Sequence, residues 1–221
     1  MSEETLAEAY KHCESIAREY DRDRWIAALF APADRRPDLH ALSAFFFETG
    51  RIKSLVREPL MGEMRLTWWR EAIDGERVGE AKGHPVAAPL IETILRRQLP
   101  VQAFEDYLLA RRDELYREEQ THTVYAPAYA MAARVLETRG ADAAAEAAGR
   151  AAKLAEGENP AAALPEIEAA EAALGRSPSA VAPAFAPLAT LRLDVKRRLA
   201  GKGPAPLWRR QIAMWIWGRS R

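Results

Sequence analysis

The sequence predicts an all-α protein, and three observations support that fold class. In most segments apolar residues recur three and four positions apart, which is the spacing of one helix face. Prolines stand at the first position of several of these segments, and glycine or proline clusters separate them. No segment keeps the alternation of apolar and polar residues that a half-buried strand requires. We therefore expect a single helical-bundle domain over residues 1–221.

The expected helices of the first part of the chain are bounded by capping or breaking residues. Glu3 and Glu4 fall in a first turn, where acids interact favourably with the helix dipole. Pro59 opens one helix and Gly75 closes it, and residues 76–84 are expected to form a polar loop. The helices are predicted at 2–20, 21–30, 37–56, 59–74, 85–98, 101–119 and 126–138. Those at 37–56 and 59–74 are expected to pack together through Leu42, Phe45, Phe46, Ile52, Leu66, Trp69 and Ile73.

The later part of the chain has a different composition. Residues 141–175 are rich in Ala and Glu and lack aromatics, so they favour helix but are expected to bury little. The GENP sequence at 157–160 is predicted to separate two helices there. The proline-rich stretch 177–187 is predicted to break or kink the chain before a helix at 188–199. A loop at 201–206 then precedes the last helix.

The charge of the chain is balanced in total but unevenly distributed. Lys plus Arg and Asp plus Glu both number 32, so no overall field attracts nucleic acid, and no nucleic-acid partner is expected. Between Arg192 and Arg221, however, nine Lys or Arg face one acid, Asp194, a net charge of +8. The first 191 residues therefore carry −8. An acidic body with a basic, tryptophan-containing end is the unusual global feature of this sequence.

Other composition features suggest where the protein resides. The single cysteine, Cys13, excludes an internal disulfide and suits a reducing compartment. The first ten residues are polar and acidic, unlike a secretory signal or an Arg-rich transit peptide. No stretch reaches the roughly 18 apolar residues of a membrane span. We expect a cytoplasmic protein, peripheral at most on the inner membrane.

The usual catalytic motifs are missing from the sequence. It has no glycine-rich phosphate loop, no HExxH, no GxSxG and no Cys/His metal spacing. The four histidines, His12, His40, His84 and His122, are scattered along the chain. No catalytic residue is therefore assigned from motifs.

Residues 20–74 carry a resemblance to a known family. Trp25 to Phe30, Arg35 with Arg36, Ala41 to Phe45, and Leu66 to Glu71 (LTWWRE) match its helix signatures in order. On these residues the chain resembles the squalene/phytoene synthase family. The resemblance implies an all-α fold of the isoprenoid synthase type and, in active members, the joining of two prenyl diphosphates. The chain is short for that family, with the missing length after about residue 156.

The chemistry of the family requires carboxylates that this chain lacks. A departing pyrophosphate needs Mg²⁺, and Mg²⁺ prefers carboxylates held on facing helices. At the family's first acidic motif, D-D-x-x-D, this sequence has Gly50, Arg51 and Ser54 with Lys53 between them. Near the expected second motif, Glu156 and Glu158 are two residues apart and so point to different helix faces. We expect no catalytic residues and no metal ligands, and Mg²⁺ only if the chain is an enzyme after all.

One branch of the family matches residues 56–73 (VREPLMGEMRLTWWREAI) better than the true synthases do. That branch includes a mitochondrial complex I assembly factor and its bacterial relatives. The chain differs from the sequence pattern of the branch at Arg57 and Met64. The resemblance implies a non-catalytic, membrane-peripheral role in building a respiratory complex, with that complex's subunits as partners. The alternatives are a prenyltransferase of isoprenoid biosynthesis and a helical module without a small ligand.

Five cations near the degraded motif are candidates for an anion site. Arg51, Lys53 and Arg57 lie within two turns, and Arg65 and Arg70 follow on the next helix. Together they could bind a diphosphate or a lipid headgroup without metal. The preferred alternative pairs them with Glu48, Glu58, Glu63 and Glu71 as ordinary ion pairs. Of the two neighbouring tryptophans, one is expected in the core and the other at its rim.

The last helix is the other candidate surface. Its expected membrane-contacting residues are Trp208, Arg209, Arg210, Trp215 and Trp217. Tryptophan and arginine together suit the interface of an anionic membrane, so such a membrane or an isoprenoid lipid is an expected partner. The equally weighted alternative docks this helix on the bundle with its tryptophans inward.

Overall fold

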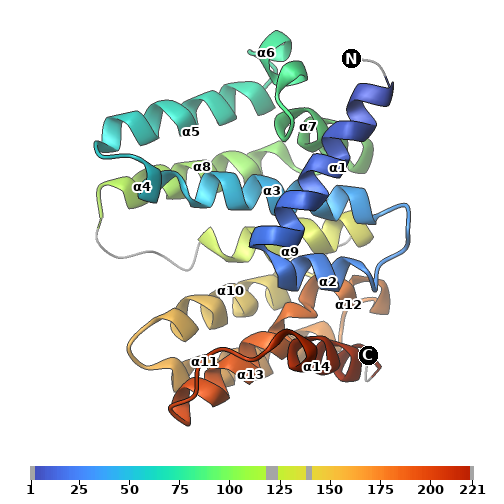
Figure 1. Ribbon diagram of the computed structural model, residues 1–221, viewed down its shortest axis with the longest axis vertical. Coiled ribbons are helices and arrows are strands. Elements are labelled where there is room, and N and C mark those ends of the chain that lie inside the picture. The colour runs from blue at the N-terminus through green and yellow to red at the C-terminus, as the bar shows by residue number, and fades with distance from the viewer. Residues whose placement is uncertain (1–2, 118–123, 138–140, 220–221) are drawn as a thin grey trace.

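The computed structural model describes residues 3–117, 124–137 and 141–219, and every regular element within them is a helix (Figure 1). This confirms the all-α prediction. The first group is α1 Glu3–Tyr20, α2 Arg22–Ala28, α3 Arg36–Gly50, α4 Ile52–Leu55, α5 Pro59–Ile73, α6 Val78–Gly83, α7 Ala87–Arg97 and α8 Val101–Leu115. The second is α9 Ala126–Leu136, α10 Asp142–Glu156, α11 Ala163–Leu174, α12 Ala182–Phe185, α13 Pro187–Leu199 and α14 Leu207–Arg219.

Two predicted elements need correction. The helix predicted at 37–56 ends at Gly50, and the short α4 begins at Ile52, so Arg51 stands at a junction. The loop predicted at 76–84 contains α6. Glu80 holds this short helix to its surroundings by accepting hydrogen bonds from Trp68 Nε1 at 2.9 Å and Arg77 Nη1 at 2.9 Å. Predicted helix positions 2, 118, 119 and 138 lie outside the described residues.

The aromatic core lies among α3, α5 and α8. All seven side chains predicted for it are buried. Phe45 is fully buried, and its ring centroid lies 5.2 Å from that of Trp69 and 5.6 Å from that of Phe104. The two apolar helices thus meet through their side chains, as predicted, although neither is the main backbone partner of the other. The backbone of α5 packs mainly against α8, and that of α3 mainly against α1 (Figure 1).

The alanine-rich segment is packed more tightly than its composition suggested. It forms α10 and α11, which lie side by side below α9 (Figure 1). The prediction that it buries little is wrong, because α10 buries Ala144, Ala145, Ala147, Ala148, Gly149 and Ala151. A Cβ added to Gly149 would lie 2.6 Å from the backbone nitrogen of Ala126. Small side chains thus allow backbones to approach closely, and many short contacts replace a few large ones.

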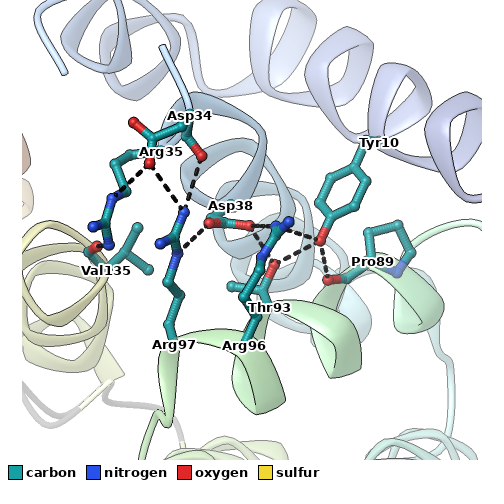
Figure 2. Close-up of polar contacts among 9 residues, drawn as sticks. All are labelled: Tyr10, Asp34, Arg35, Asp38, Pro89, Thr93, Arg96, Arg97 and Val135. Atoms are coloured by element: carbon teal, nitrogen blue, oxygen red, sulfur yellow. Dashed lines mark hydrogen bonds and ion pairs between the residues drawn. The ribbon is translucent and has the colours of Figure 1, made fainter. Parts of the chain in front are cut away.

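A buried carboxylate joins the first helices (Figure 2). Asp38 on α3 is fully buried and forms ion pairs with Arg96 and Arg97 of α7, the latter through Nε at 2.7 Å. Thr93 Oγ1 donates to the same carboxylate at 3.0 Å. From α1, the hydroxyl of Tyr10 accepts a hydrogen bond from Arg96 Nη2 at 3.1 Å. The network fixes α3 relative to α1 and α7, and α3 carries the degraded motif at its end.

We expect Asp38→Asn to reduce the free energy of unfolding by about 3 kcal/mol, because it removes the buried negative charge beside Arg97 and leaves only the exposed Asp34 at 3.6 Å. Most of this loss is expected from the contact with Arg97, because its side chain is only 14% exposed and its charge is poorly solvated. Urea unfolding followed by circular dichroism measures the loss. Asp34→Asn is the matched control, because Asp34 is 67% exposed and its ion pairs are screened by water. Equal losses in the two variants would contradict this role for Asp38.

Candidate functional site

The space in front of the degraded motif is occupied by a side chain from another helix. A Cβ added to Gly50 at the end of α3 would lie 3.3 Å from Arg111 Nη2 of α8. Any side chain at position 50 would therefore meet this guanidinium. Sequence reasoning missed Arg111, because nothing in its local sequence indicates that α8 brings it to the end of α3.

Arg111 is held in place by neutral and charged partners. Its Nη1 donates to Glu114 Oε2 at 2.9 Å and its Nε donates to the Tyr107 hydroxyl at 3.1 Å. That hydroxyl also lies 2.8 Å from Thr49 Oγ1, one residue before Gly50. Burial alone would lower the pKa of Arg111, but Tyr107 and Glu114 more than offset it and raise the pKa above its ordinary value. Arg111 is a permanent cation at this site.

The residues near the expected second motif do not complete a metal site. Glu156, at the end of α10, accepts a hydrogen bond from the hydroxyl of Tyr125, whereas Glu158 is exposed beyond the helix. Burial and the contact with Glu156 raise the pKa of Tyr125, while the positive charge of Arg111 acts to lower it.

The available donor groups do not suit the Mg²⁺ ions that the resemblance implies. Glu114 keeps one buried oxygen without a hydrogen-bond partner among the described residues, but its charge is already matched by Arg111. No group of three or more His, Cys, Asp or Glu side chains in the described part of the chain could hold a metal ion. With Gly50, Arg51 and Ser54 at the first motif, these residues do not fit Mg²⁺.

A cavity of about 570 Å³ lies between α2, α9, α10 and α13 and reaches Tyr125 and Glu156. Its other wall contains Arg210, which forms ion pairs with Asp23 and Asp194. The full lining of the cavity contains four acidic and four basic side chains, so its charges balance within the chain.

The structure brings together two of the five predicted anion-binding cations. Arg51 and Arg65 line a second cavity of about 390 Å³ with Trp68, Trp69 and His84. Lys53 instead donates to the carbonyl oxygen of Arg117. Arg57 is exposed in the turn before α5. Arg70 lies away from this cavity, in a small depression that it shares with Leu66, Thr67, Leu108, Leu109 and Arg112.

The ion pairs expected for these cations are partly wrong. Glu71 pairs with Arg77, and Glu63 accepts a hydrogen bond from the Tyr116 hydroxyl at 2.8 Å. Glu48 lines the cavity beside Arg51, and burial raises the pKa of its carboxyl while Arg51 acts to lower it. Two arginines and two tryptophans thus line one cavity, an arrangement that suits an anion attached to a flat apolar group.

The aromatic side of this cavity has a defined arrangement. Trp69 is buried and Trp68 is half-buried, which confirms the core-and-rim prediction. The ring of His84 lies 4.9 Å from that of Trp68 and 5.2 Å from that of Trp69. Its Nδ1 accepts hydrogen bonds from the backbone N–H groups of Val86 at 3.2 Å and Ala87 at 3.1 Å, at the start of α7.

The five residues predicted to contact a membrane are divided between two faces of α14. Arg210 and Trp217 face the body of the protein, where Arg210 binds Asp23 and Trp217 Nε1 donates to Glu171 Oε1 at 2.9 Å. The docking alternative is therefore correct for these two residues. The other three, Trp208, Arg209 and Trp215, are exposed. No described helix combines the length and the apolar character that crossing a bilayer demands.

His84 is expected to make stability depend on pH. Burial lowers its pKa below the ordinary value of about 6.5, with repulsion from His12 as a smaller cause. The folded state therefore favours neutral His84. The contribution of His84 to the unfolding free energy is complete above the ordinary pKa of about 6.5, and it is lost as the pH falls from there through the lowered pKa of the folded state. We expect wild-type protein to lose more unfolding free energy between pH 7.5 and pH 5 than His84→Asn, whose amide oxygen keeps an acceptor at the helix start. Urea titrations at both pH values measure this difference, and identical pH dependence would contradict it.

Comparison with known proteins identifies the family of the chain. Residues 17–156 match the model of the squalene/phytoene synthase family. The chain is 30% identical over 89 residues to NADH dehydrogenase (ubiquinone) complex I, assembly factor 6, of Bos taurus, which covers 40% of this chain and 27% of that protein. The human protein of the same name is 28% identical over 88 residues, 40% of this chain and 26% of the relative.

A bacterial relative carries a different name. The bifunctional protein CrtB/UppS of Streptomyces coelicolor is 33% identical over 109 residues, 48% of this chain and 19% of the relative. The matched segments thus span less than a third of these relatives. The family match includes the degraded motif and continues through α10 to Glu156. The chain belongs to the squalene/phytoene synthase family.

Proposed function

We propose that this chain is a non-catalytic family member that assists, at a membrane surface, in the assembly of a respiratory complex of the complex I type. The observation that carries the proposal is the guanidinium of Arg111 in front of Gly50. In the family's reaction, Mg²⁺ held by carboxylates would stabilise the leaving pyrophosphate. Here this position has a fixed protein cation whose charge is matched by Glu114.

The assembly role is supported by similarity to the assembly factor 6 proteins of several animals. Similarity alone does not choose between assembly and synthesis, because CrtB/UppS is matched at a comparable identity. Gly50, Arg51, Ser54 and the placement of Arg111 support the non-catalytic role. The subunits that the chain would contact are part of this proposal.

Prenyl transfer is the competing function, and it makes different demands on the site. It needs carboxylates from two helices that converge on a shared metal. In the described part of the chain, Glu156 contacts Tyr125 and Glu114 contacts Arg111. No feature of the described site favours prenyl transfer over the assembly role.

Deletion of the gene in its source organism tests the proposed function. We expect less assembled complex I on native gels, with unchanged squalene, phytoene and carotenoid content. Re-expression of the wild type should restore the complex, and so should the Arg65→Gln variant, because Arg65 is exposed and the proposed role uses no anion chemistry there. Normal complex I together with a lost isoprenoid product would contradict the proposal and support the enzyme alternative.

A further inference from the structure

Helix α14 has an exposed apolar face that the body of the protein leaves uncovered. Trp208 is 57% exposed, Trp215 52% and Ile216 57%, which is unusual for side chains of this size. We call this the outward face of α14, and define it as Leu207, Trp208, Ile212, Trp215 and Ile216.

The opposite side of the same helix is firmly attached. Met214 is fully buried and Trp217 is 8% exposed. Arg210 forms ion pairs with Asp23 of α2 and Asp194 of α13. The orientation of α14 is therefore set by specific partners, and the outward face is presented to solvent in a fixed direction.

The charges beside the outward face have one sign. The helix contains Arg209, Arg210 and Arg219 and no acidic residue. Two of these cations lie over the exposed indoles, Arg209 Cζ 5.0 Å from the ring centroid of Trp208 and Arg219 Cζ 4.7 Å from that of Trp215. Indole faces flanked by guanidinium groups match the boundary between acyl chains and anionic headgroups.

A second segment continues this surface. Phe30, just after α2, is 43% exposed. Phe30, Trp215 and Arg219 line a common hollow of about 320 Å³. An apolar chain entering this hollow would have a guanidinium at its rim, an arrangement that suits a lipid tail below an anionic headgroup.

We infer that the outward face of α14, together with Phe30, binds the surface of an anionic lipid membrane. This inference deepens the proposed function, on which its biological setting rests. The choice of a membrane over a protein partner follows from the one-signed charge and the two indoles at the interface. Arg210 takes no part in this contact, because its guanidinium is paired with Asp23 and Asp194. Trp217 contributes only to the wall of the hollow, because its ring is buried against the body of the protein.

Flotation of the full chain with vesicles tests the inference directly. The vesicles contain phosphatidylcholine alone or with phosphatidylglycerol, at salt concentrations of about 0.05 M and about 0.5 M. We expect flotation with the anionic vesicles at low salt, and much less with neutral vesicles or at high salt. Arg209→Glu/Arg219→Glu should weaken binding about tenfold or more, since each cation near an anionic leaflet contributes roughly fivefold.

A matched control separates this surface from net charge. Lys11→Glu/Lys82→Glu changes the charge by the same amount at two exposed positions on α1 and α6, and should bind as the wild type does. Trp208→Ser/Trp215→Ser should lose binding while its thermal unfolding stays unchanged, because both indoles are exposed.

Several results would overturn the inference. One is equal binding by the Trp variant and the lysine control; another is no flotation with any vesicle. Self-association in the absence of lipid that Trp208→Ser/Trp215→Ser abolishes would assign the face to a second copy of the chain. Loss of complex I in the deletion strain without vesicle binding would overturn this inference and leave the assembly role itself standing. Vesicle binding with normal complex I would overturn only the proposed function.

Discussion

The ion pair of the largely buried Arg111 with Glu114 is the interaction on which the character of this site depends. A charge removed from water is tolerated only when nearby groups compensate it. Here Glu114 supplies the opposite charge, and Tyr107 links the guanidinium to Thr49, one residue before Gly50. Glycine at position 50 leaves the space that the guanidinium fills. Arg111, its counter-charge Glu114 and the small residue Gly50 therefore form one arrangement. Within it the carboxylate of Glu114 is paired with a guanidinium of the chain itself.

This arrangement requires a fixed position for α3, whose last residue is Gly50. The contacts that fix it are made at the start of the helix. Asp38 binds Arg96 and Arg97 of α7 there, and Tyr10 of α1 joins the same network (Figure 2). On the opposite side, α10 approaches α9 so closely at Gly149 that no side chain fits between them. A scaffold of the synthase type is thus kept with tight packing although Gly50, Arg51 and Ser54 stand at its first acidic motif. A fold kept in this way fits the proposal that the protein functions through its surface and not through chemistry in a cavity.

Local signals predicted the helices because each is set by its own residues. The proline that opens α5 and the apolar spacing of α3 are visible in the sequence, and so is the absence of acids at Gly50, Arg51 and Ser54. The role of Arg111 was not predictable, because it depends on α8 crossing the end of α3. The sequence also could not show which face of α14 packs on the body of the protein, because that depends on partners far away in the sequence. Periodicity groups residues by face, but only the distant partner Asp23 shows which cation faces inward.

The central claim is that the chain does not join prenyl diphosphates, and an assay of that reaction is its most direct test. Purified protein is incubated with farnesyl or geranylgeranyl diphosphate and Mg²⁺ or Mn²⁺, and squalene and phytoene are measured. The wild type and the triple variant Gly50→Asp/Arg51→Asp/Ser54→Asp are compared. We expect no product from either, because an aspartate at position 50 would pair with Arg111 and the second acidic helix would still be missing. Product from the wild type that is lost on chelation would contradict the account.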